Sequence, residues 1–347
     1  MGPAWMRNTG VVVVAVLALL GCATTPPASQ PGRAAVHQGT QSPRPAARHE
    51  LRAGGSAWVS VSVATVWRSP RSPRPVDSPA LQNPVAMVRW LSGMSLDQRR
   101  DLSGRADTQA LMGDRVRVLG VRAGWVRVAV PGQPSPLDAR GYPGWVPRRQ
   151  LTARPPTVTP SWATVTRRTA WLRTDAAEGR RRVRVSYGTR LPVVGRTARE
   201  LRVATPDGTV LRVAAGDVVE HPRSRPALAP SSASLVSAAT SFVGLAYLWS
   251  GASGFGVDCS GLTWLVYRVH GIRIPRDASP QSEAGTPVRF LRRGDLLFYA
   301  DGGLVHHVTM YVGGGRMVHA PGTGDLVRVD TTASLGPQYA GARRFLP

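Results

Sequence analysis

The stretch that decides the fold is GVDCSGLTWLVYRVHG, residues 256–271, in the last third of the chain. Its apolar side chains recur at helical spacing over residues 262–269, and Gly271 is a typical helix terminator. Cys259 therefore stands near the predicted start of a helix, where backbone N–H groups and the helix dipole stabilise a thiolate. The other cysteine, Cys22, lies near the N-terminus and has a separate explanation. We therefore predict that Cys259 is a nucleophile and not half of a disulfide.

A cysteine nucleophile needs a base, because an unassisted thiol supplies little thiolate at neutral pH. The chain offers histidines in HHVTMYVGGGRMVHAP, residues 306–321, a pattern typical of two β-strands joined by a glycine turn at 313–315. A histidine on each strand could face one site. One imidazole would exchange the proton of Cys259, and the second would orient the first through a hydrogen bond.

The N-terminus carries an export pattern. Arg7 precedes an uninterrupted apolar run over 11–20, which is too short to span a bilayer comfortably, since spanning takes roughly 20 apolar residues. The run ends in LLGC, residues 19–22, which resembles the lipobox of bacterial lipoproteins. That resemblance implies a signal peptide over residues 1–21, acylation of Cys22 and a lipid tether to a bacterial membrane. The alternative is an ordinary secretory signal followed by an incidental cysteine.

The chain is strongly cationic: its formal net charge is +24, and all 44 basic residues are arginine. Such a surface favours anionic partners, which include lipid head groups, wall polymers and nucleic acid. Export makes nucleic acid the least suitable of these, and the sequence carries no nucleic-acid motif. We predict no nucleic-acid partner, no metal and no cofactor, and the sequence leaves the oligomeric state open.

Composition divides the chain that follows the signal. Residues 22–56 are rich in Pro, Ala, Ser, Gln and Arg and predict a disordered linker. Short alternating strands over 57–153 predict a small barrel, whose GYPGWVPRRQL ending resembles a bacterial SH3 domain. Similar strands over 160–221, without the Gly-Trp signature, predict a second SH3-like barrel. Residues 231–347 are enough for one further compact domain.

An insert over 79–104 of the first barrel is expected to be helical. Asn83 can cap a helix that starts at Pro84, and Ser95 with Gln98 forms a capping box for a second helix. Such an insert either shapes a neighbouring surface or elaborates the packing, and the sequence favours neither.

Six ordered segments of the last domain resemble the NlpC-type, papain-like peptidases of bacterial cell walls. They are YLWSG at 247–251, DCSGL at 258–262, IPRDASPQ at 274–281, RRGDLLFY at 292–299, HHVTMYVG at 306–313 and MVHAP at 317–321. The resemblance implies Cys259 as nucleophile, His307 as general base and His319 as the third polar residue. His306, beside His307, is the neighbour to exclude.

Two SH3-like domains ahead of such a peptidase, the first with a helical insert, resemble wall-peptide recyclers and murein endopeptidases. That resemblance implies cleavage between γ-D-glutamate and a diamino acid in peptidoglycan stem peptides, with the first barrel helping to bind the free amine of L-alanine. It also implies substrate contacts by Tyr247, Asp258 and Ser260, and by Asp114 and Tyr142 of the barrel. A carboxylate suits this task, because a free ammonium needs a paired anion when it leaves water. The alternative for Asp114 is a turn residue.

The predicted protein is thus multidomain, with two small all-β SH3-like barrels followed by an α+β papain-like NlpC-type catalytic domain. We expect a cysteine endopeptidase of the cell envelope, tethered through lipidated Cys22 and facing the wall or periplasm, that hydrolyses the γ-D-glutamyl–diamino acid bond. Two other functions stay open: a non-catalytic wall-binding lipoprotein, and a thiol acyltransferase or amidase on the same fold. Ser250 and Thr309 stand where the family usually has glycine, which concerns close backbone approach and not the reaction class.

Overall fold

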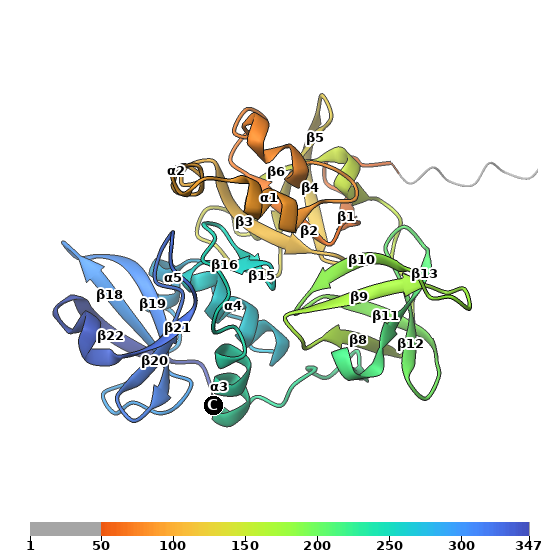
Figure 1. Ribbon diagram of the computed structural model, residues 1–347. Coiled ribbons are helices and arrows are strands. Elements are labelled where there is room, and N and C mark those ends of the chain that lie inside the picture. The colour runs from red at the N-terminus through yellow and green to blue at the C-terminus, as the bar shows by residue number, and fades with distance from the viewer. Residues whose placement is uncertain (1–49, 347) are drawn as a thin grey trace, which may run out of the picture. The chain divides into compact units, whose positions relative to one another are not determined.

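The computed structural model describes residues 50–346. The predicted signal over 1–21, the lipidation site Cys22 and nearly all of the predicted linker 22–56 lie outside these residues. Across the described residues, no helix is both long enough and apolar enough to cross a membrane. They form two small β domains and a third domain of sheet and helix (Figure 1).

The first barrel is a seven-stranded antiparallel sheet in the order β3-β2-β6-β5-β4-β1-β7. Strand β4 and the start of β5 alternate buried and exposed side chains, and small apolar residues such as Val59, Val116 and Val128 form one core. The strands are β1 (Ser56–Val59), β2 (Val63–Trp67), β3 (Ala106–Leu111), β4 (Arg115–Arg122), β5 (Trp125–Val130), β6 (Tyr142–Pro147) and β7 (Leu151–Thr152), and a 3-10 turn, η2 (Arg148–Gln150), precedes β7.

The predicted helical insert is present between β2 and β3. It consists of η1 (Pro75–Ala80), α1 (Met87–Gly93) and α2 (Leu96–Arg100). The capping box of α2 has the predicted bonds, since Ser95 Oγ accepts the Gln98 N–H at 3.2 Å and Gln98 Oε1 accepts the Ser95 N–H at 2.9 Å. The expected helix start at Pro84 is wrong. Asn83 donates from its Nδ2 to the carbonyl oxygen of Arg149 instead of capping a helix, and α1 begins later.

The second barrel repeats this architecture with a second seven-stranded antiparallel sheet, in the order β10-β9-β13-β12-β11-β8-β14. Its core is a separate cluster that includes Leu172, Val185 and Val213. The elements are β8 (Ser161–Val165), β9 (Thr169–Thr174), β10 (Arg181–Ser186), β11 (Arg190–Arg196), β12 (Glu200–Ala204), β13 (Val210–Ala214), η3 (Ala215–Asp217) and β14 (Val218–Pro222).

The third domain packs helices against a six-stranded sheet in the order β17-β22-β18-β19-β20-β21, beside a two-stranded ribbon, β15-β16. Nearly every residue of its longest helix, α4, is buried, so this helix is covered on more sides than the one apolar face that the sequence spacing predicts. The elements are α3 (Ser232–Thr240), β15 (Ala252–Ser253), β16 (Gly256–Val257), α4 (Cys259–Val269), α5 (Ala278–Glu283), β17 (Thr286–Pro287), β18 (Leu296–Asp301), β19 (Leu304–Gly313), β20 (Arg316–His319), β21 (Arg328–Thr331), η4 (Thr332–Gln338) and β22 (Tyr339–Arg344).

Both barrels contact the loop that leads to Cys259. Trp249 donates from its indole N–H to the carbonyl oxygen of Ala106 in the first barrel, at 3.0 Å. The N–H of Gly254 donates to Ser186 Oγ of the second barrel at 2.8 Å. A Cβ at Gly254 would lie 1.6 Å from a backbone oxygen of the second barrel, so only glycine permits this approach. The barrels therefore help to hold the loop before Cys259 in place.

Candidate active site

Cys259 is the first residue of helix α4. Asp258 caps this helix, because its Oδ1 accepts the N–H of Gly261 at 2.7 Å. A Cβ at position 261 would lie 2.0 Å from the carbonyl oxygen of Gly251, so glycine is needed for the loop and the helix to pack this closely. Cys259 thus lies at the positive end of the helix dipole, as the sequence predicts.

Burial has the largest effect on the ionisation of the thiol. Burial and the carboxylate of Asp258 together raise the pKa of Cys259 to about 12. The backbone N–H groups of Val308 and Ser260 and the charge of Arg276 lower the pKa by smaller amounts. The resting cysteine is therefore a neutral thiol, which becomes a nucleophile as a base removes its proton.

Two histidines and one carboxylate form a hydrogen-bonded chain across three adjacent strands, β19, β20 and β21. His307 Nε2 lies 2.8 Å from His319 Nδ1, and His319 Nε2 lies 3.0 Å from Asp330 Oδ2. Because a carboxylate accepts, neutral His319 carries its proton on Nε2 and accepts with Nδ1. His307 then donates from Nε2, which leaves the lone pair of its Nδ1 as the base. No local sequence motif marks Asp330, so the sequence alone does not predict its part in this chain.

Both histidines are neutral at neutral pH. Burial, together with the neighbouring His319 and His306, lowers the pKa of His307 to about 3. Burial also lowers the pKa of His319, although Asp330 opposes this. The catalytic candidates therefore rest as a thiol and an uncharged imidazole, which is able to accept a proton.

The structure separates the two adjacent histidines. His307 is only 7% exposed, whereas His306 is exposed to solvent, because neighbouring residues of a strand point to opposite faces.

Two positions where the family usually has glycine carry larger residues in this chain, Ser250 and Thr309. Ser250 has a φ of 64°, a region that favours glycine, and its hydroxyl is buried without a partner among the described residues. Thr309 is fully buried on β19.

Arg276, which the sequence analysis did not single out, links the nucleophile loop to the first barrel. It is 1% exposed and donates to both carboxylate oxygens of Asp258, at 3.0 and 2.7 Å, and to Ser260 Oγ at 2.9 Å. Its Nε donates to Thr108 Oγ1 of β3 at 2.9 Å. Asp258 and Ser260, both predicted substrate contacts, are therefore fixed by the same guanidinium.

A cluster of acidic side chains lies beside this pair. Tyr142, from the first barrel, donates to Asp277 Oδ2 at 2.9 Å. Burial raises the pKa of Asp277, and repulsion by Asp258 and Asp107 adds to the rise. Arg68 pairs with Asp107, and Arg276 pairs with Asp258 and also lies 3.9 Å from Asp277, so the three carboxyl groups outnumber the two guanidiniums by one. Among residues 50–346, no group of three His, Cys, Asp or Glu side chains is arranged to hold a metal ion.

The remaining two predicted contacts differ in their surroundings. Tyr247 is buried, and the charges of Cys259 and Asp258 add to the raised pKa that burial gives its hydroxyl. Asp114 pairs with Arg268 of α4 instead, at 2.9 Å, and accepts the N–H of Leu111 at 3.0 Å. These bonds agree with the alternative interpretation of Asp114 as a turn residue. Asp114 does not belong to the cluster of side chains around Cys259. Asp107 is the carboxylate of the first barrel that this cluster contains.

Comparisons with known proteins agree with this domain arrangement. Residues 244–343 match the NlpC/P60 family, residues 165–218 match the YKFC SH3b2 domain and residues 99–151 match the bacterial dipeptidyl-peptidase Sh3 domain. These matches lie within the three predicted domain spans, whose outer bounds stay predictions.

Similar proteins align with most of the chain. A γ-D-glutamyl-L-lysine dipeptidyl-peptidase of Bacillus cereus is 39% identical, covering 87% of this chain and 94% of its own. The protein of the same name from Bacillus subtilis is 38% identical, covering 79% and 92%. A crystal structure of an NlpC/P60 family protein from Bacillus cereus superposes with a TM-score of 0.80 at 39% identity, covering 84% of this chain and all of the other. The chain therefore belongs to the NlpC/P60 family of cysteine peptidases and carries two SH3-like domains ahead of its catalytic domain.

Proposed function

We propose that the protein hydrolyses the γ-D-glutamyl–diamino acid bond of peptidoglycan stem peptides that begin with a free L-alanine. The observation that carries the reaction is the chain Asp330–His319–His307 next to a cysteine at a helix start. The substrate class is supported by the two relatives named as γ-D-glutamyl-L-lysine dipeptidyl-peptidases, which resemble this chain over most of its length.

In the first half of the reaction, Cys259 attacks the amide carbonyl carbon. His307 Nδ1 takes the thiol proton, and His319 and Asp330 keep His307 in the tautomer that can do so. The N–H of Cys259 lacks a partner within its own helix, so it is free to stabilise the oxyanion. His307 then gives its proton to the leaving α-amine of the diamino acid, which departs as the thioester forms.

In the second half, water resolves the thioester. His307 removes a proton from the water, whose oxygen bonds to the carbonyl carbon while the carbon–sulfur bond breaks. The sulfur leaves as a thiolate and recovers the proton from His307. The products are a dipeptide that ends in D-glutamate and a peptide that begins with the diamino acid.

Selection of a free amine is supported by the charge beside the nucleophile. Asp107, Asp258 and Asp277 exceed their two arginine partners by one negative charge, which an ammonium would neutralise. Tyr142 fixes Asp277, and Ser260 shares Arg276 with Asp258. Tyr247, also near Asp258, completes the group of contacts to the first residues of the peptide.

The proposal extends to the location of the protein. Cleavage before Cys22 and acylation of its thiol and amine would hold the enzyme on a bacterial membrane, facing the wall or periplasm, with residues 22–56 as the spacer. Metabolic labelling with an alkyne-tagged fatty acid tests this. We expect label on the wild-type chain and none on Cys22→Ser, and label on neither would contradict the lipid anchor.

The activity itself is tested with the peptides L-Ala-γ-D-Glu-L-Lys and L-Ala-γ-D-Glu-diaminopimelate in water enriched in oxygen-18, followed by mass spectrometry. We expect L-Ala-D-Glu with one heavy oxygen in its new carboxylate, and no product with Cys259→Ala. Cleavage by Cys259→Ala, or no cleavage of either peptide by the wild-type protein, would contradict the proposal.

The same assay separates the other functions. A non-catalytic wall-binding protein gives no product at all. An acyltransferase gives a dipeptide joined to an added amine or alcohol, without heavy oxygen. Incorporation of oxygen-18 therefore assigns the reaction to hydrolysis.

A further inference from the structure

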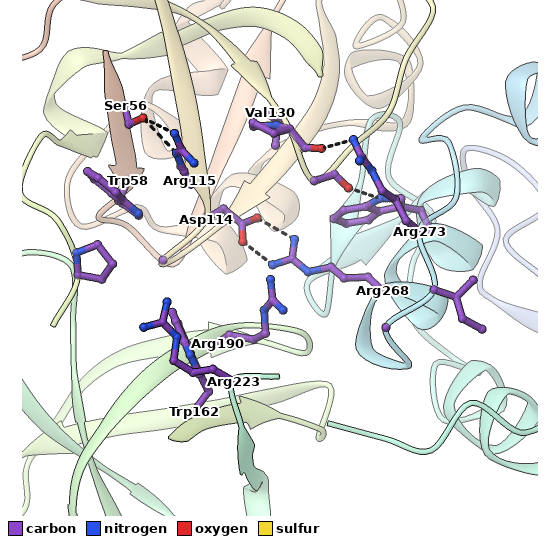
Figure 2. Close-up of a pocket in the computed structure, with 17 residues that line it drawn as sticks. Ser56, Trp58, Asp114, Arg115, Val130, Trp162, Arg190, Arg223, Arg268 and Arg273 are labelled. Atoms are coloured by element: carbon purple, nitrogen blue, oxygen red, sulfur yellow. Dashed lines mark hydrogen bonds and ion pairs between the residues drawn. The ribbon is translucent and has the colours of Figure 1, made fainter. Parts of the chain in front are cut away.

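A pocket of about 620 Å³ lies where the two barrels meet the C-terminal half of α4. Of the residues predicted for the active site it includes only Asp114. Figure 2 shows Arg190 reaching from β11 of the second barrel toward the Asp114–Arg268 pair, with Trp58 and Trp162 to the left of this view. The volume falls within the range of small-molecule pockets, roughly 300–1,000 Å³. The pocket is therefore large enough for a ligand of its own.

Its lining has a strong excess of positive charge. The one carboxylate is Asp114, and the arginines are Arg115, Arg190, Arg223, Arg268 and Arg273. Asp114 has little capacity left for another partner, because it accepts from both terminal nitrogens of Arg268 and from the backbone N–H of Leu111. One pair thus leaves four arginines without an anion.

Two of these four arginines already have acceptors, and the other two are available to a ligand. Arg115 donates to Ser56 Oγ, and Arg273 donates to the carbonyl oxygen of Pro131, each at 2.9 Å. Within residues 50–346, the guanidiniums of Arg190 and Arg223 donate to no acceptor. Arg190 is exposed to solvent, and the nearby charge of Arg268 lowers its pKa. Crowding of like charges makes this pocket a favourable place for an anion.

Aromatic faces accompany the arginines. Trp58 and Trp162 are half-buried, so part of each indole ring is open to the pocket. Arg223 stacks on the Trp162 ring, with 5.4 Å between the guanidinium carbon and the ring centre. Indole rings offer a flat apolar surface with a polar edge, which suits the apolar face of a sugar ring.

We propose that this pocket binds an anionic saccharide, with its phosphate or carboxylate on Arg190 and Arg223 and its sugar ring against the tryptophans. A guanidinium matches both anions, because its parallel N–H groups donate to two oxygens at once. A family that acts on the cell wall meets such sugars in the glycan and in wall polymers. The pocket would hold the enzyme on that material, at a site separate from the one that contains Cys259.

Calorimetric titration of the full-length Cys259→Ala protein tests the proposal without any peptidase activity. The probes are glucose 1-phosphate, glucuronic acid, inorganic phosphate and uncharged glucose. We expect glucose 1-phosphate or glucuronic acid to bind at least about 10-fold more tightly than glucose, and to weaken as salt rises from about 50 mM to about 500 mM. The stronger of the two probes identifies the anion as phosphate or carboxylate.

Variants locate the binding. We expect the double variant Arg190→Gln/Arg223→Gln to lose at least about 10-fold in affinity for the stronger sugar probe. Trp162→Ala should weaken that sugar and leave inorganic phosphate unchanged. Arg122→Gln is the matched control, because Arg122 is an exposed arginine of β4 outside the pocket. In the wild-type background, the double variant should keep the peptidase activity, which reports that it folds.

Three results would overturn the proposal. One is saturable binding of neither anionic sugar. Another is binding that the double variant leaves unchanged, which places the ligand elsewhere. The third is equal affinity for inorganic phosphate and glucose 1-phosphate, which makes the pocket a simple anion site without a role for the sugar.

Discussion

Two arginine–aspartate pairs flank helix α4, and their surroundings have opposite charge. Near its N-terminus, Arg276 pairs with Asp258 and Arg68 pairs with Asp107, and the further carboxyl group of Asp277 leaves an acidic excess of one. In its C-terminal half, Arg268 pairs with Asp114 among four more arginines, so that the excess there is basic. Both arginines bond to the first barrel: Arg276 donates to Thr108, and Arg268 donates to Asp114.

The net charge of +24 therefore does not describe the surroundings of either end of α4. In each pair the carboxylate and the guanidinium largely cancel, and the neighbours decide which ion the region favours. The acidic end suits a peptide ammonium beside Cys259. The basic end suits the anion of a saccharide.

Breaking the two pairs separately should change the stability of the protein more than any other substitution considered below. Arg276→Met leaves Asp258 buried without its cation and should lower the free energy of unfolding by about 3–5 kcal/mol. Arg268→Met should cost clearly less, because it also removes the repulsion that lowers the pKa of Arg190. Urea denaturation followed by tryptophan fluorescence measures both. Equal losses would remove the contrast between the two ends.

The next effect concerns the histidine chain. Asp330→Ala removes the acceptor that fixes the tautomer of His319, and we expect kcat to fall roughly 100-fold with little change in KM. Asp330→Asn keeps an acceptor oxygen and should restore most of the activity. Asp325→Ala is the matched control, since Asp325 also pairs with Arg328 but does not contact His319. Equal activity of the Ala and Asn variants would refute tautomer control by Asp330.

A pH titration tests the state of the base. Because burial lowers the pKa of His307 to about 3, its imidazole should remain uncharged at pH about 5, where an ordinary histidine is largely protonated. His307 therefore loses its ability to accept a proton only when the pH falls to the pKa of its imidazole in the folded protein, well below the usual range for histidine. Nitrogen-15 NMR of labelled histidine in the free enzyme measures this. A midpoint for His307 between pH about 6 and 7 would contradict the neutral resting pair.

The smallest effect concerns the strained serine before the nucleophile. Ser250→Gly should stabilise the protein by about 1 kcal/mol, because glycine adopts a φ of 64° without strain and removes an unpaired buried hydroxyl. Ser253→Gly is the matched control, since Ser253 also has a buried, unpaired hydroxyl among the described residues but no positive φ. A shift in Tm measures each. Equal shifts would show that the backbone of Ser250 is not strained.

The sequence predicts those parts of the site that local patterns specify. The start of α4 follows from the glycine loop and the apolar period, and the β19–β20 hairpin follows from strand alternation around three glycines. The capping box at Ser95 is likewise local. The predicted start of α1 at Pro84 is wrong, because the side chain of Asn83 donates to the carbonyl oxygen of Arg149, much later in the chain, and does not cap a helix.

The parts that the sequence does not predict depend on distant partners. Arg276 donates to Thr108, which lies in another domain, and no sequence motif connects the two residues. Asp330 becomes important only because β21 pairs with β20 and brings it to His319. Asp107 and Asp114 are close in sequence, and only the packing of the first barrel decides which of them faces Tyr142.

Selection for a free amine by the acidic end of α4 is tested most directly by comparing kcat/KM for L-Ala-γ-D-Glu-L-Lys and its N-acetylated form. We expect the free peptide to be cleaved at least about 100-fold more efficiently, because acetylation removes the ammonium that the excess carboxylate needs. Asp107→Asn should reduce this preference by about 10-fold, and Asp138→Asn, which alters another arginine-paired carboxylate of the first barrel, should not. Equal cleavage of the two peptides by the wild-type enzyme would contradict recognition of the amine.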